Sequence, residues 1–311
     1  MKEKYYIGID LGGTSIKLGI VDKNGDIVAK YEAPTPHAKY EETIELFVKM
    51  IEQTGIEKDQ MLGVGIGVPG FVNIEDGSID ELVNVGWKNV HLKNDLEKKV
   101  GLPVFVDNDA NLAALGEMWK GAGNGLTDLV CITIGTGVGA GVIINEKIYH
   151  GKNAMAGEVG HITINPHSEI RCNCGKNGCL ETEVSATAMV NFNQRAIEGG
   201  KETLLPIEAT TKDIFEAAQK GDSLAIEIID NTANYLGLAL SQIATVLAPE
   251  RIVIGGGVSK AGELLLRPTM QYFKRYSTEK IAEQTEIVLA ELENDAGIVG
   301  ASRLVADQMA K

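Results

Sequence analysis

One pattern of strands and glycine turns occurs twice in the sequence, and this repetition limits the possible folds more than any other feature. The stretches "IGIDLGGTSIKLGIVDKNGDIVAK" and "ITIGTGVGAGVIINEKIYHG" both read as apolar strand, Gly/Thr turn, apolar strand, turn and strand. Asn24-Gly25 in the first copy is a strong hairpin signal. The offset of about 125 residues predicts an architectural duplication, with two similar halves.

The segments around the two copies alternate between helical and strand patterns. Residues 41–55 show helical spacing, with Ile44, Phe47, Val48 and Ile51 on one face. Further patterns predict buried strands at 61–68, 102–109 and 251–255 and helices at 92–101, 110–119 and 235–249. This alternation predicts an α/β protein.

Three glycine-rich turns, "LGGTS", "TGVGA" and "GGGVS", each follow an apolar strand. Glycine lets a backbone approach a phosphate or a base closely, and the duplicated frame favours ligand binding over plain tight turns. "GIGVPG" and "GTGVGA" match the dinucleotide fingerprint, but neither opens a predicted helix. The chain also lacks a P-loop motif, so any bound ATP would be held by hairpin turns.

The charge of the chain excludes some classes of partner. The formal net charge is −14 and no basic run is present, so we expect no nucleic-acid or anionic-membrane partner. No stretch approaches the roughly 20 apolar residues of a membrane span, and "MKEKYYIGIDLGGT" lacks an apolar signal region. We therefore expect a soluble, cytoplasmic protein.

Three of the four cysteines, Cys172, Cys174 and Cys179, lie within the short stretch "RCNCGKNGCLE". Thiols stay reduced in the cytoplasm, so clustered cysteines there indicate a metal site before a disulfide.

Several motifs together resemble the ROK family of sugar kinases and repressors: "DLGGTSIK", "NDAN", "GTGVGAG", "GEVGH" and "CNCGKNGCLE" occur in the family's order from about residue 6 onward. "NVGWKN" and "ALGEMWKGAG" are similar to the ROK-type glucokinases of Gram-positive bacteria. The resemblance implies the actin-like ATPase fold, with two α/β domains of ribonuclease H-like topology and a cleft between them.

The domains expected from this resemblance are a small N-terminal domain, 1–119 plus 299–311, and a large domain, 120–298, that carries the cysteine loop. Family repressors place a helix-turn-helix domain before the first motif. Because nine residues precede Asp10 here, we expect a kinase.

The resemblance also implies a Zn²⁺ site with Cys172, Cys174, Cys179 and His161 as ligands. His167 is the competing histidine. Four protein ligands leave no open position for water, so the zinc would be structural. The second ring nitrogen of His161 would then be free to donate to a sugar hydroxyl.

The catalytic base implied by the resemblance is Asp109 of "NDAN", beside an acceptor hydroxyl. A purely structural alternative is that Asp109 caps the helix that follows. Asp107 is expected to be structural. The remaining sugar contacts carried over from the family are Gly70, Asn108, Glu158, His161 and Glu181.

For the nucleotide, the resemblance implies that Asp10 orients hydrated Mg²⁺ and that Gly12, Gly13 and Thr14 approach the phosphates. Thr136 and Gly137 form a second phosphate turn, and Gly256 and Gly257 lie on the adenosine side. Lys17 is a weaker candidate for a phosphate cation, because its alternation with Ile16 and Leu18 is also compatible with a solvent-facing side chain.

The leading hypothesis is an ATP-dependent kinase for the 6-hydroxyl of glucose. N-acetylmannosamine, fructose or allose are alternative acceptors, and a non-catalytic sugar sensor is the alternative from another class. The family further implies a homodimer or homotetramer.

Overall fold

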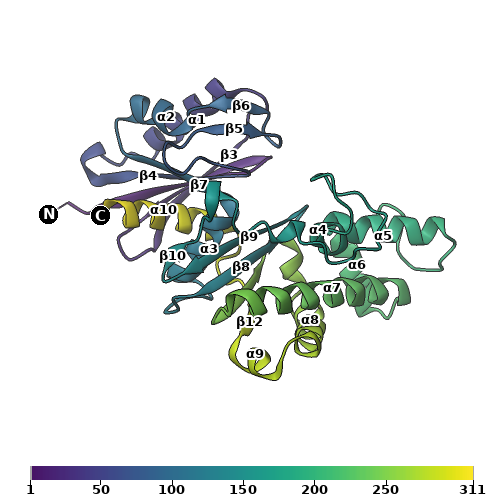
Figure 1. The fold of residues 1–311 in the computed structure, drawn as a ribbon. Helices are drawn as coiled ribbons and strands as arrows, with labels where there is room; N and C mark the ends of the chain where they lie inside the picture. Colours follow the sequence, from purple (N-terminus) through teal and green to yellow (C-terminus); the bar gives the residue numbers. More distant parts are fainter. Residues whose placement is uncertain (1, 311) are drawn as a thin grey trace. The chain divides into compact units, whose positions relative to one another are not determined.

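The computed structural model describes residues 2–310, which pack into two compact units (Figure 1). The first unit comprises the residues up to Thr127, Gly141–Gly157 and the residues from Glu291 onward. The second unit comprises Asp128–Ala140 and Glu158–Ala290.

The first sheet has the strand order β3-β2-β1-β4-β7. Its strands are β1 (Tyr5–Leu11), β2 (Ser15–Val21), β3 (Ile27–Pro34), β4 (Met61–Val68) and β7 (Val104–Asn108). β1, β2 and β3 pair antiparallel through short turns, whereas β1, β4 and β7 run parallel. Asp10 is paired with Gly67, which is paired with Asp107, so the three strands end at one edge of the sheet.

Four longer helices belong to the first unit within the described residues: α1 (Tyr40–Gln53), α2 (Leu92–Val100), α3 (Asp109–Lys120) and α10 (Ala296–Met309). Ile44, Phe47 and Ile51 of α1 are buried as the helical spacing predicted. Helix α10, at the far end of the chain, packs against α3 and β1 (yellow in Figure 1).

The second sheet repeats the order of the first, as β10-β9-β8-β11-β12. Its strands are β8 (Leu129–Ile134), β9 (Val138–Ile144), β10 (Lys147–Ile148), β11 (Arg251–Gly255) and β12 (Glu286–Leu289). β9 and β10 pair antiparallel, whereas β8, β11 and β12 run parallel. In chain order, both sheets therefore read third, second, first, fourth, fifth, and the predicted duplication is confirmed at the level of topology.

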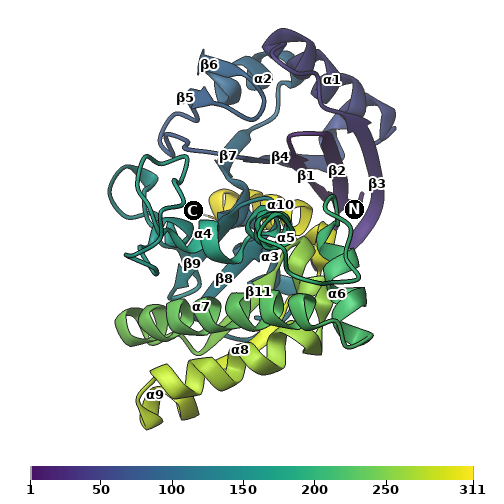
Figure 2. The ribbon, with the colours of Figure 1, turned by 90° about the vertical axis from the view of Figure 1, so that its right-hand side faces the viewer.

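The second unit carries the helices α4 (Leu180–Val184), α5 (Ala186–Glu198), α6 (Thr211–Gln219), α7 (Ser223–Leu247), α8 (Glu263–Tyr276) and α9 (Glu279–Gln284). The long α7 packs along α8 (Figure 2). Side-chain caps begin several of these helices, since Ser185, Thr210 and Asp222 accept hydrogen bonds from the first-turn amides of α5, α6 and α7.

The predicted domain boundaries differ from the observed units at three places. Residues 120–127, 141–157 and 291–298, predicted in the large domain, pack with the first unit. A boundary at residue 299 would also divide α10, which is one continuous helix. In the middle segment, His150 is hydrogen-bonded to Asp107 of β7, which ties that segment to the first unit.

Short elements complete the fold. Strands β5 (Ile79–Leu82) and β6 (Trp87–Val90) form a hairpin, and 3₁₀ turns occur at η1 (Lys58–Gln60), η2 (Lys152–Ala154), η3 (Val159–His161), η4 (Gly257–Ala261) and η5 (Glu293–Asp295). Throughout residues 2–310, no helix has both the length and the apolar character needed to cross a lipid bilayer.

Candidate active site

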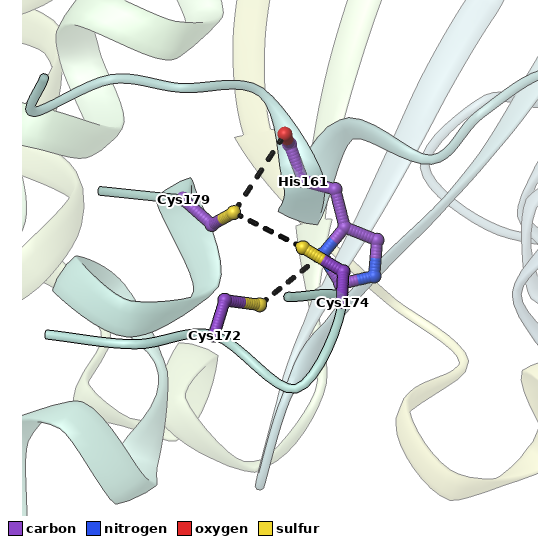
Figure 3. A group of neighbouring side chains, drawn as sticks. All are labelled: His161, Cys172, Cys174 and Cys179. Atoms are coloured by element: carbon purple, nitrogen blue, oxygen red, sulfur yellow. Dashed lines mark hydrogen bonds between the residues drawn. The ribbon is translucent and has the colours of Figure 1, made fainter. Parts of the chain in front are cut away.

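The three clustered cysteines and His161 converge in the second unit (Figure 3). His161 ends η3, Cys172 and Cys174 lie in the following loop, and Cys179 precedes α4. One candidate ligand atom from each residue lies within 4.8 Å of all the others. Cys172 Sγ is 3.5 Å from His161 Nδ1, and Cys174 Sγ is 3.5 Å from Cys179 Sγ. His167, the competing histidine, is not part of this group.

The loop reaches this geometry through backbone turns. Cys172 accepts at its carbonyl from the amide of Gly175 (2.9 Å) and donates its own amide to Lys176 (2.8 Å). Gly178 has a φ of 69°, and a Cβ there would lie 1.9 Å from the carbonyl oxygen of Asn165. Because any larger residue would collide with that backbone, glycine is required for the return toward Cys179.

The donor set fits zinc. Three thiols and one imidazole nitrogen are the soft-to-borderline ligands of a closed tetrahedral Zn²⁺ site. Burial raises the pKa of Cys172, and it raises the pKa of Cys179 to about 12. Since a metal binds the thiolate forms, zinc binding here would release protons from thiols that are otherwise protonated at neutral pH.

The outward-facing nitrogen of His161 is directed toward an acidic neighbour. Nδ1 faces Cys172, while Nε2 lies 3.8 Å from Glu158 Oε2. Burial raises the pKa of Glu158, with His161 opposing the shift and Glu181 adding to it. Glu158, His161 and Glu181, all predicted sugar contacts, therefore lie together beside the cysteine cluster.

Glu181, on the first turn of α4, also contacts the second glycine turn. Its Oε2 accepts a hydrogen bond from the amide of Val138 (3.0 Å). In the turn, the amide of Gly135 is 2.9 Å from the carbonyl oxygen of Gly137. The predicted phosphate residues Thr136 and Gly137 thus lie between the end of β8 and the start of β9.

The third glycine turn is beside the second. Gly256 has a φ of 84°, and a Cβ there would lie 2.5 Å from the carbonyl oxygen of Ile134. Gly257 then opens η4. The predicted adenosine turn and the predicted second phosphate turn therefore meet at the ends of β8 and β11.

In the first unit, the hairpin between β1 and β2 carries the first glycine turn. The amide of Gly12 donates to Ser15 (2.9 Å), and the Thr35 hydroxyl donates to the Gly12 carbonyl (2.7 Å). Thr14 and Gly13 complete the turn, and no heavy atom lies within 4 Å of a Cβ placed at Gly13. Thr35 directly follows β3, which pairs with β2, and no sequence motif indicated its contact with the turn.

Asp10 is at the end of β1, opposite Lys17 in the β1–β2 register. Burial raises the pKa of Asp10, and the positive charge of Lys17 partly offsets this shift. A half-buried carboxylate beside an open glycine turn suits a hydrated Mg²⁺, which favours oxygen ligands.

Asn108, rather than Asp109, caps α3. Asn108 Oδ1 accepts from the amides of Ala110 (2.9 Å) and Asn111 (3.2 Å), and Asn108 Nδ2 donates to the carbonyl of Gly70 (3.2 Å). Asp109 is the first residue of the helix, and its Oδ1 is 2.8 Å from the amide of Ala110. The cap that was an alternative role for Asp109 is therefore supplied mainly by Asn108.

A buried pair next to Asp109 was not anticipated. The side chain of Asp107 is 1% exposed and accepts hydrogen bonds from His150 Nε2 (2.7 Å) and Asn111 Nδ2 (3.0 Å). His150 and Phe71 line a cavity of about 770 Å³ in the first unit. A structural role for Asp107 stays a prediction, which its burial and its two hydrogen bonds support. His150 carries no functional sequence signal of its own, since "YHG" only ends the second copy of the strand-and-turn pattern.

The predicted residues therefore form two sets, each within one unit. The first unit brings Asp10 and the Gly12–Thr14 turn to the sheet edge where Asp109, Asn108 and Gly70 also lie. The second unit gathers the cysteine cluster, Glu158, Glu181 and the other two glycine turns.

Comparison with known proteins places the chain in a family. The family model described as "ROK family" matches residues 6–308. The chain belongs to the ROK family. A curated relative, a glucokinase from Halalkalibacterium halodurans, is 44% identical over 99% of this chain and 97% of its own length.

Solved ROK structures share the fold. A ROK family glucokinase from Streptomyces griseus, in complex with glucose and AMPPNP, has a TM-score of 0.82 and 34% identity and covers 97% of this chain and 99% of that one. A ROK transcriptional regulator, a homologue of E. coli MLC, has a TM-score of 0.89 and 27% identity and covers 99% of this chain but 78% of its own. The predicted actin-like ATPase fold with two α/β domains is confirmed.

Proposed function

We propose that this ROK protein is an ATP-dependent glucokinase that transfers the γ-phosphoryl group to the 6-hydroxyl of glucose. The observation that carries the proposal is the full-length similarity to glucokinases, one of them solved with glucose and AMPPNP, combined with the place of Asp109. Asp109 directly follows β7, at the carboxyl ends of the parallel strands β1, β4 and β7, and ligands of open α/β sheets bind at the carboxyl ends of such strands.

Asp109 is the proposed general base. As the 6-hydroxyl oxygen forms its bond to the γ-phosphorus, the bond from that phosphorus to the bridging oxygen of ADP breaks, and the hydroxyl proton passes to the Asp109 carboxylate. The bond from Asn108 Nδ2 to the Gly70 carbonyl holds the start of α3 against the Gly70 turn. This contact would fix the direction from which Asp109 meets the hydroxyl.

The other sugar contacts proposed are Glu158, His161 and Glu181. Carboxylates accept hydrogen bonds from sugar hydroxyls, and Nε2 of His161 faces away from the cysteines and can donate one. Zn²⁺ held by Cys172, Cys174, Cys179 and Nδ1 of His161 would fix the tautomer and orientation of that ring.

ATP is proposed to bind at the three glycine turns, with Asp10 holding the Mg²⁺ that offsets phosphate charge when bound. Gly12, Gly13 and Thr14 in the first unit, and Thr136 and Gly137 in the second, offer amides and hydroxyls to phosphate oxygens. Gly256 and Gly257 are proposed for the adenosine side. We further propose a cytoplasmic homodimer or homotetramer.

Initial rates with Mg-ATP test the proposal across glucose, N-acetylmannosamine, fructose and allose. We expect a large preference for glucose and a fall of about 10²–10⁴-fold in Asp109→Asn. Preference for another hexose would keep the mechanism and change the substrate. Binding of glucose without turnover of any sugar would make the protein a sugar sensor.

A further inference from the structure

Three hydrogen bonds fasten the second glycine turn to the junction between α4 and α5. The amide of Val138 donates to Glu181 Oε2 (3.0 Å), and the amide of Ala186 donates to the carbonyl of Gly135 (2.8 Å). The hydroxyl of Thr187 donates to the carbonyl of Thr136 (2.9 Å). Gly135, Thr136 and Val138 are thus each hydrogen-bonded to the α4–α5 corner, residues 181–187.

The corner itself is well defined. Ser185 is 2% exposed, its hydroxyl accepts from the amide of Ala188 (3.1 Å), and its amide donates to the carbonyl of Glu181 (3.2 Å). Ser185 therefore ends α4 and begins α5 at the same residue. Because α4 and α5 share Ser185, a movement of this corner that breaks one of its three hydrogen bonds to the glycine turn would also disturb the other two.

Glu181 lies directly against the turn. A Cβ placed on Gly137 would come within 2.4 Å of Glu181 Oε2. The bond to Val138 uses this oxygen, and no hydrogen bond within residues 2–310 engages Oε1. Oε2 of Glu181 is thus hydrogen-bonded to the proposed phosphate turn, which leaves Oε1 of the same carboxylate for a sugar hydroxyl.

We infer that Glu181 and Thr187 couple nucleotide binding to sugar binding, with Thr187 as a positioning residue for the phosphate turn. This inference rests on the proposed function. A sugar hydroxyl on Oε1 would hold the carboxylate in the orientation that receives the Val138 amide, and an ordered turn would hold the carboxylate for the sugar. Whichever ligand binds first therefore orders part of the site for the second ligand, so the second ligand binds with a smaller loss of conformational entropy.

Calorimetric titration of Mg-AMPPNP and of glucose, each alone and with the other saturating, tests the inference on the full chain. In the wild type we expect each ligand to tighten the other by the same factor, about fivefold. Thr187→Val removes the hydroxyl and keeps the branched shape. It should weaken Mg-AMPPNP binding about fivefold, leave the affinity for glucose alone unchanged and bring the coupling factor close to one.

Two further variants serve as controls. Thr187→Ser keeps a hydroxyl and should restore wild-type affinities. Thr245→Val removes another exposed helical hydroxyl, one that bonds a backbone carbonyl within α7 at 2.7 Å, and should change neither affinity nor coupling.

The outcomes separate the inference from the proposed function. If the wild type transfers phosphate but binds its two ligands independently, the inference is overturned and the proposed kinase function is retained. Unchanged nucleotide affinity and coupling in a folded Thr187→Val variant would overturn it as well. A wild type that binds no nucleotide would instead remove the proposed function on which the inference rests.

Discussion

At the scale of single residues, three consecutive polar side chains at the end of β7 have three different environments. Asp107 is buried and hydrogen-bonded to His150, Asn108 caps α3, and Asp109 stands on the first turn of the helix. The motif "NDAN" drew attention to this place, but the sequence could not assign the cap. Which of two neighbouring residues caps depends on backbone angles, and Asn108 is the extended residue, with φ −67° and ψ 143°.

Asp10→Asn is predicted to stabilise the protein while strongly lowering its activity. Burial raises the pKa of Asp10, so the charged form of this carboxyl is disfavoured in the folded state relative to the unfolded state. The favourable contribution of this group is complete below the ordinary aspartate pKa and is lost as the pH rises through the raised value. The variant should therefore melt higher than the wild type at pH 7.

Thermal unfolding of both proteins between pH 7 and about pH 4 provides the check, because the two melting temperatures should converge as Asp10 protonates. Turnover in the variant should fall on the order of 100-fold or more. A variant less stable than the wild type at pH 7 would show that the charge of Asp10 is stabilising in the fold.

His150→Ala is predicted to lower the free energy of unfolding by about 2 kcal/mol, because it removes a hydrogen bond from the buried Asp107 carboxylate. His150→Gln keeps a donor and should lose less. Urea unfolding followed by tryptophan fluorescence is suitable, since Trp87 and Trp119 both lie in the first unit. The exposed His91 gives the matched control, and equal effects of His91→Ala and His150→Ala would contradict the assigned role.

At the scale of elements, the cysteine loop was the most predictable part of the site and its connection to α4 the least. The clustered cysteines indicated a metal site and the family resemblance implied His161 as the fourth ligand, and the four residues converge. The contact of Glu181 with Val138 joins segments 43 positions apart, which no local pattern encodes. Similarly, β5 and β6 were missed because each has four residues, too few to establish a period.

Purified protein is predicted to contain one zinc per chain, and Cys174→Ser is predicted to lose it. Metal analysis measures this directly. His167→Ala should retain the zinc, because His167 is not in the cluster. Removing the metal should also weaken glucose binding, since His161 and Glu181 stand on the segments that the cluster joins. A protein that binds glucose equally well with and without zinc would argue against that link.

At the scale of the whole molecule, the repeated strand order was predictable and the domain limits were not. Alternating apolar strands and turns encode topology locally, but the limits depend on where α10 packs. Within the first unit, the buried carboxylate of Glu117 on α3 accepts hydrogen bonds from the amides of Glu291 and Leu292, just before α10 begins. Contacts between residues this far apart in the chain cannot be predicted from local sequence patterns.

Gly300→Ala is predicted to destabilise the first unit by about 3 kcal/mol through overpacking. A Cβ at Gly300 of α10 would lie 1.7 Å from the carbonyl oxygen of Leu112 on α3. Relieving this clash requires the backbone of one helix to move, which costs more than a change of side-chain rotamer. Urea unfolding followed by tryptophan fluorescence measures the loss. Gly13→Ala in the same unit, where a Cβ would meet no atom of a non-neighbouring residue within 4 Å, should cost much less, and similar costs at both sites would contradict close packing of α10.

The proposed role of Asp109 as the base of a glucokinase is tested by separating sugar binding from phosphate transfer in the Asp109→Asn variant. Glucose affinity and the single-turnover rate of phosphate transfer from Mg-ATP would be determined on the same preparation of Asp109→Asn. We expect glucose binding within a few-fold of the wild type and transfer slower by about 10²–10⁴-fold. Transfer at the wild-type rate with glucose bound would contradict it.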